Sequence, residues 1–233
     1  MIRPLLVLFL LGALQGLVGW IMVQSGLEDS ELLYVSHYKL AIHFILALVL
    51  LCYVLWFALK LLIPSQQLTF NPSLRRFTAW LIGLLTLQLI YGAFMAGLKA
   101  ATAAPTWPTI NGVWWPDNVS SFGGRQFSGI SFLVDNPLVI HFIHRNLGYS
   151  LAILLCIWTW RAFRIKGSQI FKTARGWPLM IILLQVILGV LTVLSSVNTK
   201  NFLWLGVAHQ FMAMLLLLSL LWMFYIIRGV KTS

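Results

Sequence analysis

The chain has 233 residues, of which 60% are hydrophobic and only 9% charged, and its mean hydropathy is +0.90. So little charge cannot cover the surface of a water-soluble domain, so the composition excludes a soluble globular protein and indicates an integral membrane protein. The net charge of +11 does not imply a nucleic-acid partner, because membrane topology explains it better. Cys52 and Cys156 both lie in apolar segments, so we expect neither a disulfide framework nor a CxxC motif.

Six segments are long and apolar enough to form helices that cross a bilayer. In chain order they are residues 4–23, 39–62, 75–97, 137–160, 177–196 and 202–227. The first could be read as a signal peptide behind Arg3, but no convincing small-x-small cleavage site follows it. The sequence therefore predicts an all-α integral membrane protein with six transmembrane helices.

The basic residues are distributed unevenly between the connections on the two sides of the membrane. All five acidic residues fall on the side that carries only four basic residues: Lys39, Lys99, Arg125 and Lys200. Eleven basic residues fall on the other side: Arg3, Lys60, Arg75, Arg76, Arg161, Arg164, Lys166, Lys172, Arg175, Arg228 and Lys231. The positive-inside rule then predicts a multi-pass protein with both termini in the cytoplasm. Short connections and the lack of a presequence favour a bacterial inner membrane.

The segment 98–136 is unlike the other connections, because it has about forty residues and is predicted to face outward. It contains Trp107-Pro108, Asn111-Gly112 and the run from Trp114 to Pro116, which are signals for turns. Long connections in compact bundles are usually lids or binding loops. We expect this segment to fold as a cap over the outer surface.

A polar and small pair recurs in every odd-numbered span, and a histidine recurs near the outer end of every even-numbered span. The pairs are Gln15 and Gly19, Gln88 and Gly92, and Gln185 and Gly189. The histidines are His43, His144 and His209, each followed four residues later by Ala47, Gly148 or Ala213. Gln and Gly on one helix face suit a close interhelical contact, and a small residue beside an imidazole leaves a flat gap that a porphyrin would need.

The repeating unit is thus a helical hairpin with one histidine, present three times. Ligation of a haem iron by two histidines needs two hairpins that face each other in a four-helix bundle. Residues 75–233 can form one complete bundle with His144 and His209 as axial ligands, and with the outer loop 98–136. Residues 1–62, with His43, then form half of a second bundle, and residues 63–74 form a cytoplasmic linker.

Other readings of these polar residues remain open. His144 and His209 could be core histidines hydrogen-bonded to Gln side chains or backbone. We expect His141, one turn before His144, to support a ligand or lie at the interface rather than bind iron. Arg145 could reach the interface or pair with a haem propionate. We expect His37, in a polar outer loop, to be solvated.

These motifs, in their order along the chain, resemble the haem A synthase family over essentially the whole sequence. The resemblance rests on the runs Gln15-Gly16-x-x-Gly19-Trp20, Val35-Ser36-x-Tyr38-Lys39-Leu40-x-x-His43, Ala96-Gly97-Leu98-Lys99-Ala100, Trp107-Pro108-x-x-Asn111-Gly112, His144-Arg145-x-x-x-Tyr149 and Ala208-His209-Gln210. Members of this family have eight helices in two four-helix bundles and oxidise a methyl group of haem O to the formyl group of haem A. The family's first hairpin has no counterpart in this sequence.

The resemblance implies an oxidoreductase in which His144 and His209 ligate the iron of haem b, with Arg145 beside them, while His43 serves catalysis at the haem O site as one of two histidines that would ligate iron there. Electrons would come from a separate donor, and a haem O synthase is a further expected partner. Two other functions stay open: an electron-transfer module that binds haem b, and a non-catalytic factor for oxidase assembly. Whether the chain is active without the missing hairpin, or completes its second bundle by self-association, also stays open.

Overall fold

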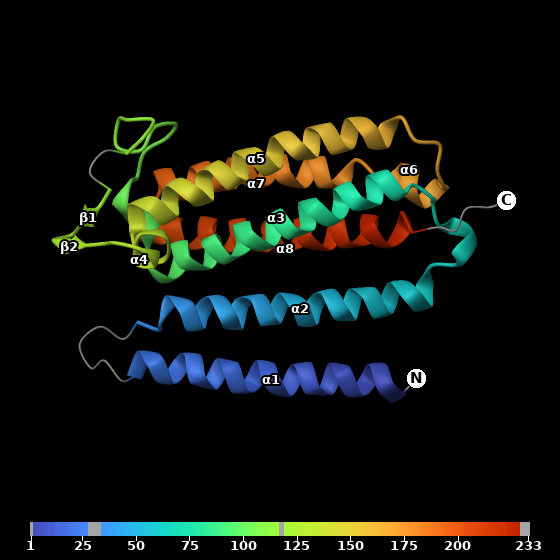
Figure 1. Cartoon of the computed structure of the whole chain (residues 1–233), viewed down its shortest axis with the longest axis horizontal. Helices are drawn as coiled ribbons and strands as arrows, with labels where there is room; N and C mark the ends of the chain where they lie inside the picture. The colour runs from blue at the N-terminus through green and yellow to red at the C-terminus, as the bar shows by residue number, and fades with distance from the viewer. Residues whose placement is uncertain (1, 28–33, 117–118, 229–233) are drawn as a thin grey trace.

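The computed structural model describes residues 2–27, 34–116 and 119–228. Its six long helices run roughly parallel to one another (Figure 1), and each is long and apolar enough to cross a membrane. They are α1 (Ile2–Leu27), α2 (His37–Leu62), α3 (Pro72–Gly97), α5 (Pro137–Phe163), α7 (Trp177–Leu194) and α8 (Thr199–Ile226). The prediction of an all-α, multi-pass membrane protein is therefore confirmed.

Asparagine side chains define where three of these helices begin. Asn71, Asn136 and Asn198 precede α3, α5 and α8, and each side-chain oxygen accepts a hydrogen bond from a backbone N–H of the first turn. These N–H groups have no partner within the helix, so the cap stabilises the helix start. Pro72 and Pro137 follow two of the caps, and the fixed φ of proline suits the first helical position.

Four of the helices form a closed bundle. Helix α3 packs against α5 and α8, and α7 packs against the same two helices, so α5 and α8 occupy diagonal corners. Leucines from α3, α5 and α8 fill the centre, among them Leu81, Leu155 and Leu220. Trp158, fully buried, donates a hydrogen bond from Nε1 to the Thr78 hydroxyl at 2.9 Å. The indole N–H therefore has a partner where water is excluded.

The hairpin of α1 and α2 lies beside this bundle (Figure 1). Helix α2 packs against α3 and α8, and α1 packs on α2. Much of α1 is exposed, including Phe9, Leu10 and Trp20. Such a surface is stable only in contact with lipid or with other apolar helices. The separate roles predicted for residues 1–62 and 75–233 remain predictions.

The segment between α3 and α5 folds at one end of the bundle (Figure 1). It contains a 3-10 turn at Ala100–Ala103, the antiparallel strands β1 (Ser121–Phe122) and β2 (Arg125–Gln126), and the short helix α4 (Ile130–Val134). The beginning of α1 and the end of α8 both lie at the opposite end. A 3-10 turn at Ser65–Gln67 and helix α6 (Gln169–Ala174) also lie in connections at that end.

The prediction of a solvated His37 is wrong. His37 is the first residue of α2, and its Nε2 lies 3.1 Å from both the Val134 carbonyl and the Asp135 carboxylate. Its Cβ fills the place that a side chain at Gly97 would need, only 2.6 Å from a Cβ built there. Because Gly97 has no side chain, the start of α2 can approach the end of α3 and the α4–α5 connection.

We expect Gly97→Ala to destabilise the packing of α2 on α3. The added methyl group would overlap the Cα and Cβ of His37, and such overpacking typically costs about 1–3 kcal/mol. The thermal midpoint of the detergent-purified chain should therefore fall. Gly83→Ala, in the same helix and with no neighbour within 4 Å of the new Cβ, is the matched control and should leave the midpoint unchanged or raise it slightly, because Ala favours the helix over Gly. Equal midpoints for the two variants would contradict this packing.

Candidate functional site

Each of the three histidines lies between the Gln and the Gly of the preceding helix. In the last hairpin, Gln185 Nε2 lies 3.3 Å from His209 Nε2, and a Cβ at Gly189 would lie 2.9 Å from His209 Cε1. The Gln185 amide therefore contacts the His209 ring, and Gly189, one helical turn later on α7, leaves room for that ring because it has no side chain. Any larger residue at Gly189 would displace the imidazole.

The other two hairpins repeat this contact. Gln88 Nε2 lies 3.4 Å from His144 Nε2, and a Cβ at Gly92 would lie 3.2 Å from the same ring. In the first hairpin, Gln15 Nε2 lies 3.3 Å from each ring nitrogen of His43. A Cβ at Gly19 would lie 2.8 Å from the His43 ring. The Gln and Gly pairs thus make close interhelical contacts, and their partner in each case is the imidazole, which for His144 and His209 is the hydrogen bonding to Gln that the sequence left open.

His144 and His209 meet inside the four-helix bundle. They project from the diagonal helices α5 and α8, and their ring centroids are 6.3 Å apart with an angle of 73° between the ring planes. Two metal–nitrogen bonds of about 2 Å each would span about 4 Å between the nitrogens. The distance between ring centroids is larger than this, because each centroid lies behind its nitrogen. A centroid distance of 6.3 Å is therefore of the size that an ion held by both imidazoles requires.

The contacts of His209 define which ring nitrogen is free to act as a ligand. Nδ1 lies 3.1 Å from the Gln185 backbone carbonyl, which can only accept a hydrogen bond, so Nδ1 carries the proton. Nε2 then presents a lone pair, toward which the Gln185 amide N–H points at 3.3 Å. A neutral imidazole with a backbone-bonded Nδ1–H and a bare Nε2 is a common form of metal-binding histidine.

The polar groups around the two rings are incompletely satisfied. The side-chain carbonyl oxygens of Gln88 and Gln185, and His144 Nδ1, are buried without a hydrogen-bond partner among the described residues. The gap expected beside Gly148 contains the Gln88 amide, whose nitrogen lies 3.3 Å from a Cβ built there. A single glutamine amide thus occupies the space beside the imidazole, and unsatisfied buried polar groups are unfavourable.

His43 has no such counterpart. In the described part of the chain, the pair of facing imidazoles is that of His144 and His209, and His43 contacts Gln15 on α1. The Gln15 side-chain oxygen is also buried without a partner among these residues. The first hairpin therefore carries the same local arrangement as the other two, without a second imidazole across from it.

Arg145 anchors the outer loop to α5. Its guanidinium donates hydrogen bonds to the backbone carbonyls of Thr106, Pro108 and Thr109 at 2.9–3.1 Å. Nη2 also lies 3.0 Å from Nε2 of the buried His141, one turn earlier. The long loop is thus fixed directly beside the His144 helix. Sequence reasoning did not predict this contact, because the carbonyls lie more than thirty residues away along the chain.

Comparison with known proteins identifies the family. The family model described as "Cytochrome oxidase assembly protein" matches residues 1–221. The chain belongs to this family. It is 35% identical to a heme A synthase of Flavobacterium psychrophilum over 93% of the chain, and 35% and 36% identical to heme A synthases of Bartonella tribocorum and Rhizorhabdus wittichii, each over 92% of the chain.

This member of the cytochrome oxidase assembly family spans about three-fifths of the length of its curated relatives. The matched regions cover 61%, 57% and 58% of the proteins from these three organisms. No solved structure matches the chain. The resemblance to haem A synthases inferred from the motifs is thereby confirmed at the level of the family.

We expect Arg145→Gln to loosen the loop at residues 106–112. The variant removes hydrogen bonds from a charged donor, each worth roughly 1.5–3 kcal/mol, so local opening should increase at least about tenfold. Hydrogen–deuterium exchange of the loop amides would measure this. Arg125→Gln, in the exposed strand β2, is the control. Unchanged exchange in residues 106–112 of the Arg145 variant would show that the guanidinium does not hold the loop.

Proposed function

We propose that this chain acts as a haem A synthase, oxidising a methyl group of haem O to a formyl group for cytochrome oxidase biogenesis. The relatives that bear this name match over more than nine-tenths of the chain. The observation that carries the proposal is the pair formed by His144 and His209, two imidazoles from diagonal helices that face each other inside an apolar bundle.

The residues at this pair fit a haem. Two neutral imidazoles are a suitable axial ligand set for haem iron, and the described residues contain no cluster of three or more His, Cys, Asp or Glu that would favour a bare metal ion. The contacts to Gln88 and Gln185 are long, at 3.3–3.4 Å, and leave both amide oxygens unpartnered among the described residues. These weak contacts can be exchanged for a stronger bond at small cost.

In this proposal His144 and His209 hold haem b as an electron-transfer cofactor. When bound, haem b supplies one-electron oxidation and reduction. The Gln185 carbonyl keeps the proton of His209 on Nδ1, so that Nε2 remains available as a ligand. Gly92 and Gly189 help to position the two rings, because a Cβ at Gly189 would overlap the His209 ring and a Cβ at Gly92 would make a tight contact with the His144 ring.

Arg145 is suited to bind a propionate in addition to the loop. Its present acceptors are neutral carbonyls and an imidazole. Among the described residues, no carboxylate forms an ion pair with it. A carboxylate of the cofactor would compensate this charge, and a guanidinium binds carboxylates well. The loop and a propionate would then share one cation.

We assign the substrate side of the reaction to the first hairpin. His43, in contact with Gln15 and Gly19, would orient haem O there. Two hydroxylations followed by loss of water would convert the methyl to the formyl group, and each would take one oxygen atom from dioxygen and reduce the other to water with two electrons from a separate donor. A haem O synthase would supply the substrate. The distribution of basic residues supports insertion in the inner membrane with both termini in the cytoplasm and the 98–136 loop outside.

A second candidate function is supported by the isolation of His43. Because only one pair of imidazoles faces across a bundle in the described part of the chain, the protein could bind haem b and transfer electrons without oxidising haem O. The two functions share the site at His144 and His209 and differ in what His43 does.

Pyridine haemochrome spectra and iron content of the detergent-purified chain test the cofactor site. We expect about one b-type haem per chain, lost in His144→Ala and in His209→Ala and kept in His43→Ala, because axial ligation requires both rings of the pair. His37→Ala, which removes an imidazole that contacts Asp135 instead of a glutamine, serves as the control. Haem retained in both the His144 and His209 variants would refute the assignment.

Haem extraction from cells that express the chain together with a haem O synthase tests the activity. We expect haem A to appear with the wild-type chain and to fall at least about tenfold in His43→Ala, while the b-type haem is retained. Liquid chromatography with mass spectrometry separates the two haems. Bound haem b with haem O left unconverted by the wild-type chain would instead favour the electron-transfer function.

A further inference from the structure

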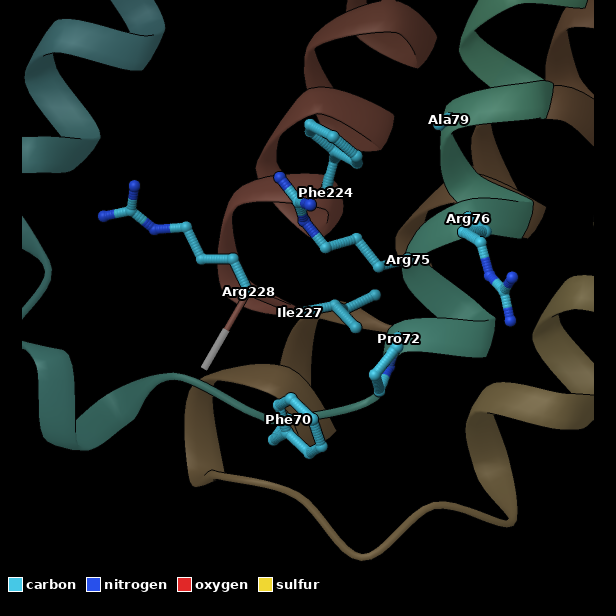
Figure 2. A pocket seen from close by; sticks show the side chains of 8 residues that line it. All are labelled: Phe70, Pro72, Arg75, Arg76, Ala79, Phe224, Ile227 and Arg228. Atoms are coloured by element: carbon cyan, nitrogen blue, oxygen red, sulfur yellow. The ribbon is translucent and has the colours of Figure 1, made fainter. Parts of the chain in front are cut away.

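A cavity lies at the end of the bundle opposite the 98–136 loop. The Thr69 N–H donates a hydrogen bond to the Ile226 carbonyl at 2.8 Å, and Phe70 pairs with Arg228 in an antiparallel bridge. This segment, the first two turns of α3 and the last turn of α8 line an open cavity of about 340 Å³ at the surface (Figure 2). The cavity therefore lies where two spanning helices end, which is the depth of lipid headgroups.

Three arginines line the cavity. Arg75 reaches from α3 toward α8, where its guanidinium lies 4.1 Å from the centre of the Phe224 ring, while Arg76 and Arg228 extend away from it in opposite directions (Figure 2). The Nε atoms of Arg75 and Arg228 are buried and have no hydrogen-bond partner among the described residues. Both Nε atoms have almost no accessible surface, so a ligand in the cavity would meet the terminal nitrogens of these guanidinium groups instead.

The positive charge at this end is not balanced by acidic residues. The lining contains no Asp or Glu, and all five acidic residues of the sequence fall between α1 and α2 or within the 98–136 segment. The described residue Asp135, for example, contacts His37 and Tyr38 near the loop. An anion would therefore meet uncompensated guanidinium groups, which favour phosphate oxygens because of their planar array of donors.

The rest of the lining is apolar. Pro72, Ala79, Phe224 and Ile227 supply carbon surface beside the arginines. A free inorganic anion makes no favourable contact with such an apolar surface, whereas a phospholipid has both a phosphate for the arginines and acyl chains for the apolar residues. Basic cavities between spanning helices are a known arrangement for binding anionic lipid headgroups. We propose that this cavity binds an anionic phospholipid, with its phosphate on Arg75, its negative charge favoured by the nearby Arg76 and Arg228, and its glycerol and first acyl carbons against Phe224 and Ala79.

This lipid would link three helices. Arg228 donates a hydrogen bond to the Tyr225 hydroxyl at 2.6 Å, and its guanidinium lies 5.6 Å from the centre of the Trp56 ring on α2. Arg75 belongs to α3, and Arg228 lies two residues after the end of α8. A lipid with its phosphate on Arg75 would therefore lie between the ends of α3 and α8, near the ring of α2 that Arg228 approaches. The site is independent of the histidines and of any haem.

The test is the binding of defined lipids to the intact, detergent-purified chain, measured by native mass spectrometry and by the thermal midpoint. We expect phosphatidylglycerol to bind and raise the midpoint, and phosphatidylcholine to do neither. In the double variant Arg75→Gln with Arg76→Gln, the apparent affinity for phosphatidylglycerol should fall at least about tenfold, since two charged donors are lost. Arg164→Gln, whose guanidinium stacks on Trp160 outside the cavity, should retain wild-type affinity.

Arg75→Lys is a conservative variant that keeps the positive charge and loses the planar donors. It separates a loss of binding from a failure to fold. We expect it to bind phosphatidylglycerol with an affinity between those of the wild type and the double variant. Equal binding of the two lipids, or equal losses in the Arg164 and double variants, would overturn the proposal. Inorganic phosphate that displaces the lipid at equal concentration would also overturn it, because the site would then recognise the anion alone.

Discussion

The constraint on which the rest of this structure depends is the cost of placing an imidazole inside an apolar bundle. In hydrocarbon a polar ring must have a partner, and the chain meets this need three times with the same device, a glutamine on the preceding helix. The glutamine can reach the ring only if the helices approach closely, and the glycine one turn later permits that approach. The histidines therefore determine the helix spacing.

Much of the fold could be predicted, because the signals are local. The apolar length of each segment predicts a spanning helix, and the Asn-Pro sequences at 71–72 and 136–137 mark two helix starts within a few residues of their positions. The position of His37 could not be predicted in this way. It depends on Gly97 and Asp135, which lie sixty and ninety-eight residues further along the chain, and no local pattern records that contact.

The candidate site was predictable in its members and only partly in its contacts. The threefold repeat identifies His43, His144 and His209 together with their Gln and Gly partners, because repetition in one register is visible in the sequence. Hydrogen bonds from Gln to the rings were one of the readings that the sequence left open, whereas the binding of Arg145 to the carbonyls of the outer loop depends on how a forty-residue segment folds back. This is a property of tertiary packing, which local patterns do not encode.

The first hairpin is packed against the bundle although its histidine has no second imidazole facing it. Helix α2 has partners in α3 and α8, so the hairpin has a place against the bundle without a second hairpin across from it. Its Gln15, Gly19 and His43 nevertheless repeat the arrangement of the complete pair. Packing alone gives no reason for an imidazole and a buried, unpartnered amide oxygen at this depth, since an apolar pair would pack there at lower cost. The proposed binding of haem O would give this first hairpin such a reason, and His43 is the residue at which the two candidate functions diverge.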